Sequence, residues 1–376
     1  MLPLCARVVR EVVISNGDQV MNKTMVDDRG IVVFNGDQTL ALLDERELEI
    51  VDVVQRTYEA HAKGESMLPH STFLRFPHAE QNRIIALPAY LGDDFRVAGM
   101  KWISSFPGNL ENGMERASAV VILNSMDTGR PQAVIEGSAI SATRTAASAA
   151  LAARRLHDGP VSRVGIIGCG RISFELMRFL LATHKDIESV LVFDKDVAKA
   201  EDFEDRCRTL SSRVTYDIAP NVTTVLAECP LTGIATTAGT PHISDLPPVH
   251  GPRTILHISL RDFAPEVILS NDNVVDDIDH VCRAQTSLHL AELATGTRDF
   301  IRSSIGDVLL GRAPAPRSEH QTTIFSPFGL GILDLALASF VFQQGIEKGM
   351  GTMVPSFFPA PWTERVKIPF RKHAQR

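Results

Sequence analysis

The sequence contains few cysteines for its length. Only five occur among 376 residues: Cys5, Cys169, Cys207, Cys229 and Cys282. Their number is odd, and no two of them form a C-x-x-C pair or a Cys/His spacing typical of zinc sites. These features argue against a disulfide scaffold and against a metal site, and they favour a reduced, cytoplasmic setting.

The sequence also lacks long apolar runs and an excess of positive charge. No uninterrupted apolar run reaches the roughly 18 residues that a membrane-spanning helix needs. Arg7, Arg10 and Glu11 interrupt the N-terminal segment where a signal peptide would carry its apolar core. The formal net charge of −7 argues against broad binding to nucleic acid or to anionic membranes. We therefore expect neither a membrane nor a nucleic acid as a partner.

Internal repeats and low-complexity tracts are absent as well, and the length allows two domains. Residues 1–28 have weak periodicity, so we expect a loose extension there. Apolar residues at helical spacing over 39–65 predict a helix that runs to about Ala62, with Asp44 as its N-cap. Turn residues then separate several short segments that we predict to be strands, namely LPHSTFLRF, RIIALPAYL, RVAGMKWISSF and ASAVVILNSMDTGRPQAVIEG.

The pattern changes at about residue 160. An alanine-rich helix is predicted over 140–156, and after it strands alternate with helices, which is typical of a parallel, doubly wound sheet. A linker-like stretch follows residue 310, and a further helix follows the linker. We therefore predict an α/β protein with a mixed α/β domain over 1–157, a Rossmann-like domain over 158–312, and a C-terminal segment over 313–376 that returns to the first domain.

The stretch RVGIIGCGRIS is typical of a dinucleotide-binding turn, because a buried strand leads into glycines that open a helix. Gly168 allows the tight turn, Gly170 lets the backbone approach a pyrophosphate, and Ser173 is small enough for the third glycine position. Asp194 ends the next strand, where a carboxylate would accept the ribose hydroxyls and favour NAD over NADP. The neighbouring Lys195 weakens that preference, and a tight turn without any ligand is the alternative.

Two cations precede this turn. Lys101 follows a strand-like segment and could hold a substrate carboxylate or transfer a proton. Arg144 is the one large charged group among small residues at the start of a helix, where it could bind a carboxylate or phosphate, and Thr145 could donate its hydroxyl to the same anion. The alternative for each cation is an ordinary surface charge.

The linked motifs add a resemblance. K-x-x-x-x-x-P-x-N-x-x-x-G, T-G-x-P, S-A-x-R-T-A-A-S and V-x-I-I-G-x-G occur in order. Together they resemble the ornithine cyclodeaminase/mu-crystallin family from about residue 40 to about residue 345. The segments LPHSTFLRFP, KWISSFPGN and HISLRD look most like the branch that makes L-2,3-diaminopropionate for siderophores and peptide antibiotics. The resemblance implies a homodimer, formed through a β-barrel-like interface of an N-terminal substrate domain, and a separate NAD domain.

The resemblance also implies roles for individual residues. Lys101 and Arg144 match the family's lysine and arginine at the substrate carboxylate, and Asp262 takes the place of the aspartate at the substrate amine. The sequence departs from ornithine cyclodeaminases at Arg261 and at Arg116, which puts ornithine in doubt as the substrate. Arg75 and Arg116 are further candidates for carboxylate contacts, since guanidinium groups pair with carboxylates bidentately.

The resulting hypothesis is an NAD-dependent dehydrogenase. It would cleave N-(1-amino-1-carboxy-2-ethyl)-L-glutamate oxidatively to 2-oxoglutarate and L-2,3-diaminopropionate, with Asp262 and Lys101 as catalytic residues. The alternatives are an ornithine cyclodeaminase, a ketimine reductase and a nucleotide-binding protein without turnover, as in mu-crystallin. The expected cofactor-binding residues are Thr145, Gly168, Gly170, Arg171, Ile172, Asp194, Lys195, Thr237 and Ser259.

Three further features are expected to be structural. His242 is interpreted as a loop residue and His257 as a core residue within a strand. The acidic stretch at 276–279 is interpreted as a solvated strand end, because no His or Glu cluster accompanies it.

Overall fold

The computed structural model describes residues 29–248, 251–316 and 322–362. Ile31–Val354 form one compact unit. In the second unit, the described residues are 29–30 and 355–362, where the Phe358 amide donates a hydrogen bond to the Arg29 carbonyl. The loose extension expected at 1–28 lies outside the described residues.

The first sheet of the compact unit is largely antiparallel and has eight strands in the order β16-β1-β7-β6-β5-β4-β2, with β3 paired to β4. Among the strand pairs of the described residues in this sheet, only β1–β7 is parallel. The strands are β1 (Ile31–Phe34), β2 (Ser66–Met67), β3 (Thr72–Phe76), β4 (Ala79–Leu91), β5 (Val97–Ser105), β6 (Ala117–Asn124), β7 (Pro131–Glu136) and β16 (Thr352–Val354).

The second sheet is parallel and has the strand order β10-β9-β8-β11-β12-β15-β13-β14. The order reverses direction between β8 and β11, as in doubly wound folds that bind dinucleotides at this position. Its strands are β8 (Arg163–Ile167), β9 (Ser189–Phe193), β10 (Thr215–Ile218), β11 (Leu231–Ile234), β12 (Thr254–His257), β13 (Asp272–Val275), β14 (Ile301–Ser304) and β15 (Thr323–Ser326). The predicted α/β class with a Rossmann-like sheet is confirmed.

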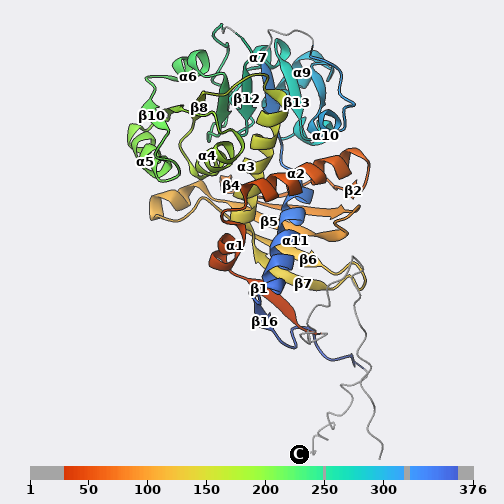
Figure 1. The fold of residues 1–376 in the computed structure, drawn as a ribbon. Coiled ribbons are helices and arrows are strands. Elements are labelled where there is room, and N and C mark those ends of the chain that lie inside the picture. The colour runs from red at the N-terminus through yellow and green to blue at the C-terminus, as the bar shows by residue number, and fades with distance from the viewer. Residues whose placement is uncertain (1–28, 249–250, 317–321, 363–376) are drawn as a thin grey trace, which may run out of the picture. The chain divides into compact units, whose positions relative to one another are not determined.

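Helices connect the strands of the second sheet and surround it (Figure 1). They are α4 (Arg171–Thr183), α5 (Val197–Arg208), α6 (Val222–Glu228), α7 (Pro265–Leu269), α8 (Ile278–Val281), α9 (Ser287–Thr295) and α10 (Ile305–Leu309). The first sheet is accompanied by α1 (Gly36–Leu43), α2 (Glu47–Ala62), a 3-10 helix (Pro107–Asn112), α3 (Gly137–Leu156) and α11 (Gly331–Glu347). No helix in the described ranges is long and apolar enough to cross a membrane.

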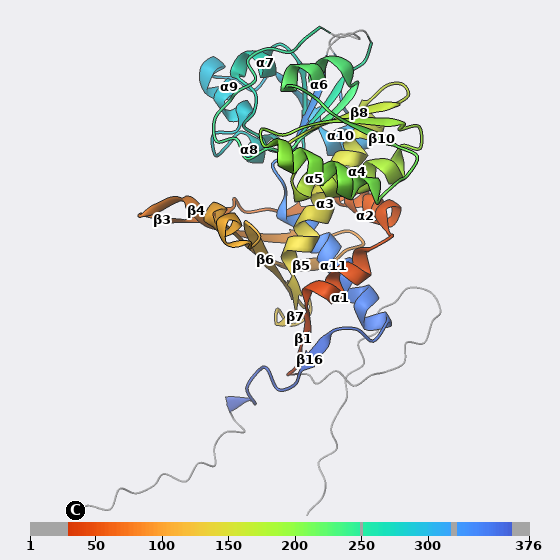
Figure 2. The same ribbon diagram turned by 90° about the vertical axis from the view of Figure 1, so that its left-hand side faces the viewer.

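Helix α3 connects the two sheets. It packs on β5 and β6 at one end and on β12 and β15 at the other. Figure 2 shows α3 extending from the first sheet toward the second. Its eight alanine side chains are all buried, and their small size lets neighbouring elements approach closely. Helix α11 packs on β4, β5, β6, α2 and α3, so the C-terminal helix contributes to the first sheet.

The predicted role of Asp44 is wrong. The segment forms two helices, and Asp44 is the C-cap of α1, whereas Arg46 is the N-cap of α2. Glu45 has a φ of 57°, in the left-handed region, which interrupts any continuous helix at this point. Asn35 caps α1 instead, through a capping box with Gln38.

The segment after residue 312 contributes to both sheets. Strand β15 pairs with β12 and β13 in the second sheet before the chain continues into α11 on the first. The C-terminal segment therefore does more than return to the first sheet. The division of the chain at 157 and 312 stays a prediction.

Candidate active site

The turn between β8 and α4 has the geometry of a nucleotide-binding turn. Gly168 has a φ of 90°, and a Cβ added there would lie 2.6 Å from the Ala235 carbonyl oxygen. A Cβ added at Gly170 would meet nothing within 4 Å, so open space remains where a pyrophosphate would approach. Ser173, in the third glycine position, donates its hydroxyl to the Gly168 carbonyl and thereby fixes the turn.

The helix that follows the turn has free N–H groups. Gly170 is the N-cap of α4, and no side chain accepts from the first-turn amides, so these amides can bind an anion. The predicted residues Arg171 and Ile172 form this first turn, with Arg171 exposed. The residues around the turn fit a dinucleotide.

The carboxylate of Asp194 lies beside the turn. It accepts hydrogen bonds from the Cys169 amide at 2.8 Å and from the Asp196 amide at 3.0 Å. The predicted residues Lys195 and Thr237 are exposed near the ends of β9 and β11. Burial raises the pKa of the Cys169 thiol to about 12, so this cysteine is an uncharged member of the turn.

Lys101 and Arg144 meet at a shared carboxylate, that of Asp334. Lys101 Nζ lies 2.8 Å from Asp334 Oδ2, and Arg144 Nε donates to Asp334 Oδ1 at 3.1 Å. All three side chains are buried, and the residues come from β5, α3 and α11. One negative charge therefore serves two cations, which leaves a net positive charge for a substrate carboxylate.

Burial lowers the pKa of Lys101 to about 8, a shift that Asp334 opposes and Arg144 reinforces. Lys101 Nζ also donates to Ser141 Oγ at 3.1 Å. With a pKa of about 8, Lys101 can serve as a charge below that pH or as a proton acceptor above it.

The guanidinium of Arg144 packs against the chain segment between β15 and α11. A Cβ added at Gly329, where φ is 95°, would lie 2.8 Å from Arg144 Nη1. The Gly329 amide donates to Asp276 Oδ2 at 2.7 Å, and the Phe328 amide donates to Asp276 Oδ1. Asp276 is fully buried and holds this segment in place, so the interpretation of residues 276–279 as a solvated strand end is wrong at Asp276, whereas Ile278 and Asp279 are exposed.

Asp262 is fully buried, and three side chains hydrogen-bond its carboxylate. Thr236 donates to Oδ1, Ser259 donates to Oδ2, and His257 Nε2 lies 3.2 Å from Oδ2. Burial raises the pKa of Asp262, but the hydrogen bonds from His257, Ser259 and Thr236 and the charge of His257 outweigh that effect and lower the pKa to about 2. Asp262 is therefore a fixed negative charge and a weak proton acceptor.

The two histidines near Asp262 differ in their surroundings. His257 is completely buried, as expected, and its Nδ1 lies 3.0 Å from Ser326 Oγ. His242 is more exposed, and its Nε2 lies 3.9 Å from Asp262 Oδ1. His257 is thus more than a core residue, because it connects Asp262 to the end of β15.

The remaining predicted residues are distributed as follows. Thr145 is on α3 beside Arg144, and its hydroxyl donates to the Ser141 carbonyl. Arg75 lies in β3 with its guanidinium over the Phe73 ring, and Arg116 directly precedes β6. The structure thus joins Lys101 with Arg144, and Ser259 with Asp262. In the described part of the chain no hydrogen bond or ion pair links the first pair to the second.

Asp334 is not among the site residues predicted from the sequence. The sequence does contain a feature that could have identified it, because Asp334 is the only acidic residue in the long apolar run FGLGILDLALASFVF. A lone carboxylate on a buried helix face needs a cationic partner. The partners are not visible locally, since Arg144 is 190 positions away.

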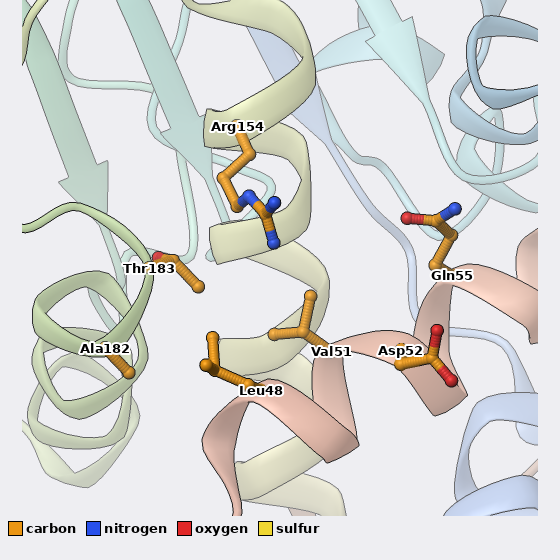
Figure 3. Close-up of a pocket in the computed structure, with 7 residues that line it drawn as sticks. All are labelled: Leu48, Val51, Asp52, Gln55, Arg154, Ala182 and Thr183. Atoms are coloured by element: carbon orange, nitrogen blue, oxygen red, sulfur yellow. The ribbon is translucent and has the colours of Figure 1, made fainter.

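One pocket found in the structure lies away from the predicted site. A pocket of about 480 Å³ lies between α2, α3 and α4 and contains none of the predicted site residues (Figure 3). It is lined by Leu48, Val51, Asp52, Gln55, Arg154, Ala182 and Thr183. Among the described residues, no group of three or more His, Cys, Asp or Glu side chains could hold a metal ion.

Comparisons with curated proteins find dehydrogenases and reductases. The chain is 29% identical over 308 residues to the N-((2S)-2-amino-2-carboxyethyl)-L-glutamate dehydrogenase of Staphylococcus aureus, covering 80% of this chain and 91% of that protein. It is 27% identical to the alanine dehydrogenase of Archaeoglobus fulgidus, covering 82% of this chain and 94% of that protein.

Solved structures share the fold. The Thermococcus litoralis Delta(1)-pyrroline-2-carboxylate reductase, in complex with NADH and L-proline, superposes with a TM-score of 0.79 at 21% identity, covering 86% of this chain and 99% of that one. An archaeal alanine dehydrogenase dimer with bound NAD superposes with a TM-score of 0.78 at 25% identity, covering 88% of this chain and 100% of that one. The ornithine cyclodeaminase/mu-crystallin family model matches residues 41–243, which contain Lys101, Arg144 and the nucleotide turn, and the chain belongs to this family.

Proposed function

We propose that this protein is an NAD-dependent dehydrogenase that cleaves N-((2S)-2-amino-2-carboxyethyl)-L-glutamate into 2-oxoglutarate and L-2,3-diaminopropionate. The observation that carries the proposal is the 29% identity, over 80% of the chain, to a dehydrogenase named for this substrate. The geometry supports it, because a nucleotide turn and a buried cationic pair occur in one compact unit. Its product would serve siderophore or peptide natural-product biosynthesis.

The dinucleotide would lie across the turn at Gly168 and Gly170, with its pyrophosphate at the free amides of α4. Asp194 ends β9 beside the turn, where its carboxylate favours NAD over NADP because it repels a 2′-phosphate. Bound NAD supplies the hydride acceptor for the reaction.

The protein's own residues would position the substrate. Lys101 and Arg144 hold a carboxylate of the glutamate part, while Asp334 keeps both cations in place. Asp262 remains ionised and steers the positively charged bridging amine through its field. Such positioning fixes the glutamate Cα–H bond relative to the hydride acceptor.

The reaction would proceed by oxidation of the secondary amine to an imine and hydrolysis of that imine. The glutamate Cα loses a hydride to the hydride acceptor and the positively charged bridging nitrogen loses one proton to water, which leaves a protonated C=N bond between them. Water adds to the carbon of this imine, and the C–N bond breaks. The products are 2-oxoglutarate, L-2,3-diaminopropionate and one reduced nicotinamide per turnover.

The test is to incubate the protein with this substrate and NAD⁺ and to follow NADH absorbance together with both products. Stoichiometric NADH and 2-oxoglutarate are expected, and their absence would overturn the proposal. L-ornithine is the comparison substrate, because a cyclodeaminase would release proline and ammonia without net NADH. In Asp262→Asn, turnover should be lost while NAD still binds in a fluorescence titration; unchanged turnover would remove Asp262 from the site.

A homodimer belongs to the same proposal. Lys101 and its contacts occupy the face of the first sheet that α3 and α11 cover. On the opposite face, Leu74, Tyr90, Trp102 and Val120 are all between 36% and 47% exposed. Trp102 and Val120 pair directly across β5 and β6. A second copy of the chain would bury this apolar face.

A further inference from the structure

Four arginines gather at one end of the first sheet. Arg75 of β3 pairs directly with Arg83 of β4, and Arg83 pairs with Ser105 of β5. Arg116 directly precedes Ala117, which pairs with Ser105, and the Arg116 carbonyl accepts from the Phe106 amide. Three neighbouring strands and the start of a fourth therefore bring Arg75, Arg83 and Arg116 together.

The fourth member comes from the second sheet. Arg261 lies in the turn after β12, between Leu260, whose φ is 71°, and the buried Asp262. The pKa of Arg83 is lowered by burial and then by the charges of Arg261, Arg116 and Arg75. Burial and the charge of Arg75 likewise lower the pKa of Arg261. Arg83 is thus close enough to each of the other three guanidinium groups for their charges to repel, and Arg75 is likewise close to Arg261.

No acidic side chain in the described ranges forms an ion pair with any of these four groups. The Arg261 guanidinium donates to the Ala284 carbonyl, and the Arg75 guanidinium lies over the Phe73 ring. Like charges held together without counterions raise the energy of the free protein. An anion with several carboxylates would relieve this repulsion.

Arg75 and Arg83 lie on the substrate side of the sheet, and Arg116 and Arg261 approach Arg83 from the segments before β6 and after β12. Residues directly opposite each other on neighbouring strands share a face, and so do alternate residues along one strand. Arg83 is opposite Ser105, and Ser105 is four residues along β5 from Lys101, so all three side chains share a face. The separation is about 13 Å along the strand, which the long lysine and arginine side chains shorten.

We propose that Arg75, Arg83, Arg116 and Arg261 form a polycarboxylate subsite that selects substrates with two or more carboxylates beyond the one held by Lys101 and Arg144. The inference deepens the proposed function and rests on the same site. It assigns Arg83 and Arg261 to substrate selection and extends the roles of Arg75 and Arg116. Amino acids with a neutral side chain leave the cluster without a counterion and are poor substrates.

The binding experiment does not depend on the reaction. Isothermal titration calorimetry of the full chain, saturated with NAD⁺, is done with tricarballylate, glutarate and butyrate, which carry three, two and one carboxylates. Affinity should fall in that order, and tricarballylate binding should weaken as salt is raised, because ions screen the attraction. Equal affinity for all three, or no binding, would overturn the subsite.

The variants Arg83→Gln and Arg261→Gln remove one charge each from the cluster. Each should weaken tricarballylate binding and lower kcat/KM for the tricarboxylate substrate about 10- to 100-fold, with NAD affinity unchanged. Arg206→Gln is the matched control, since Arg206 is an exposed residue of α5 paired with Asp202 at 2.8 Å. Thermal melting of each variant separates loss of binding from loss of folding.

The outcomes separate the subsite from the reaction. Tricarballylate binding that is lost in both variants supports the subsite even if N-((2S)-2-amino-2-carboxyethyl)-L-glutamate is not turned over. Turnover of that substrate with wild-type kcat/KM in folded Arg83→Gln and Arg261→Gln overturns the subsite and leaves the proposed function intact.

Discussion

Asp334 contributes to both the stability of the fold and the binding of substrate. Within the described ranges, it is the only carboxylate in ion-pair contact with the buried Lys101 and Arg144. Two buried cations beside one anion are stable only while that anion is present, since an uncompensated buried charge is expensive. The same excess of positive charge attracts a substrate carboxylate, so folding and binding depend on one residue.

Replacement of Asp334 by Asn should therefore affect both properties. The free energy of unfolding should fall by about 3 to 5 kcal/mol, because two buried cations lose their partner. In variant protein that remains folded at low temperature, KM should rise while NAD affinity is unchanged. Asp202→Asn is the control, because its ion pair with Arg206 is exposed and contributes little. Equal melting temperatures for wild type and Asp334→Asn would contradict the assigned role.

Lys101 predicts a pH dependence. Its pKa is lowered to about 8, so the ammonium loses its proton as pH rises through that value. If Lys101 holds a carboxylate, kcat/KM should decline about tenfold per pH unit above 8, while NAD affinity stays constant. A rise in kcat/KM over the same range would instead make Lys101 the proton acceptor. A pH profile from 6.5 to 9.5, measured at constant ionic strength, distinguishes the two.

The sequence identified some of these residues and missed others for a physical reason. Lys101 and Arg144 stand out within their own segments, because each is a long cation among apolar or small residues. Asp334 and Arg83 contribute through partners far along the chain or across a strand pair. Strand register and helix packing decide such contacts, and a local pattern does not contain them.

At the scale of elements, Gly168 and Gly170 have different tasks in the same turn. Gly168→Ala should lower the melting temperature, because the added Cβ lies 2.6 Å from the Ala235 carbonyl oxygen and φ is 90°. The left-handed conformation alone costs at least about 1 kcal/mol. Gly170→Ala should keep the melting temperature of the free protein, because its Cβ would meet no atom and its φ is −99°.

The two variants should also differ in cofactor binding. Gly170→Ala should weaken NAD binding in a fluorescence titration, since the new methyl group takes the space of the pyrophosphate. The pair forms a matched comparison, as both substitutions add one methyl group. If Gly170→Ala binds NAD with wild-type affinity, the pyrophosphate lies elsewhere.

Most elements followed from periodicity, while their boundaries depended on single backbone angles. The strand before the glycine turn and the long helix α3 were both predicted, because apolar spacing and composition determine them locally. The break between α1 and α2 was not, because the left-handed Glu45 carries no glycine or proline signal. Asp44 resembles an N-cap in sequence and acts as a C-cap in the fold.

At the scale of the molecule, the exposed face of the first sheet predicts assembly. Trp102→Glu should convert the proposed dimer into a monomer, because a charge would be buried at the centre of the apolar face. Sedimentation velocity measures the change in mass. Leu293→Glu is the control, as Leu293 is 67% exposed on α9 and lies outside this face. A wild-type monomer, or a dimer that tolerates Trp102→Glu, would contradict the assignment.

The fold class could be predicted from the sequence, but the order in which the chain contributes strands to the two sheets could be predicted only in part. Alternating strands and helices indicated the doubly wound sheet, whose parallel strands the structure confirms. Strand β15 was not predicted, because a linker-like segment precedes it. Its four residues also contain no pattern that indicates which sheet they belong to.

The pairing of β1 with β16 has a consequence for synthesis. The strand that leaves the ribosome early, Ile31–Phe34, has its antiparallel partner at Thr352–Val354, and α11 also covers the first sheet from the far end of the chain. The second sheet has all its strands once Ser326 has been made. The first sheet is therefore begun before the second sheet and completed after it. Its apolar strands remain exposed until α11 and β16 have been translated. Chaperone demand during translation should fall on residues 31–136, ahead of the nucleotide turn.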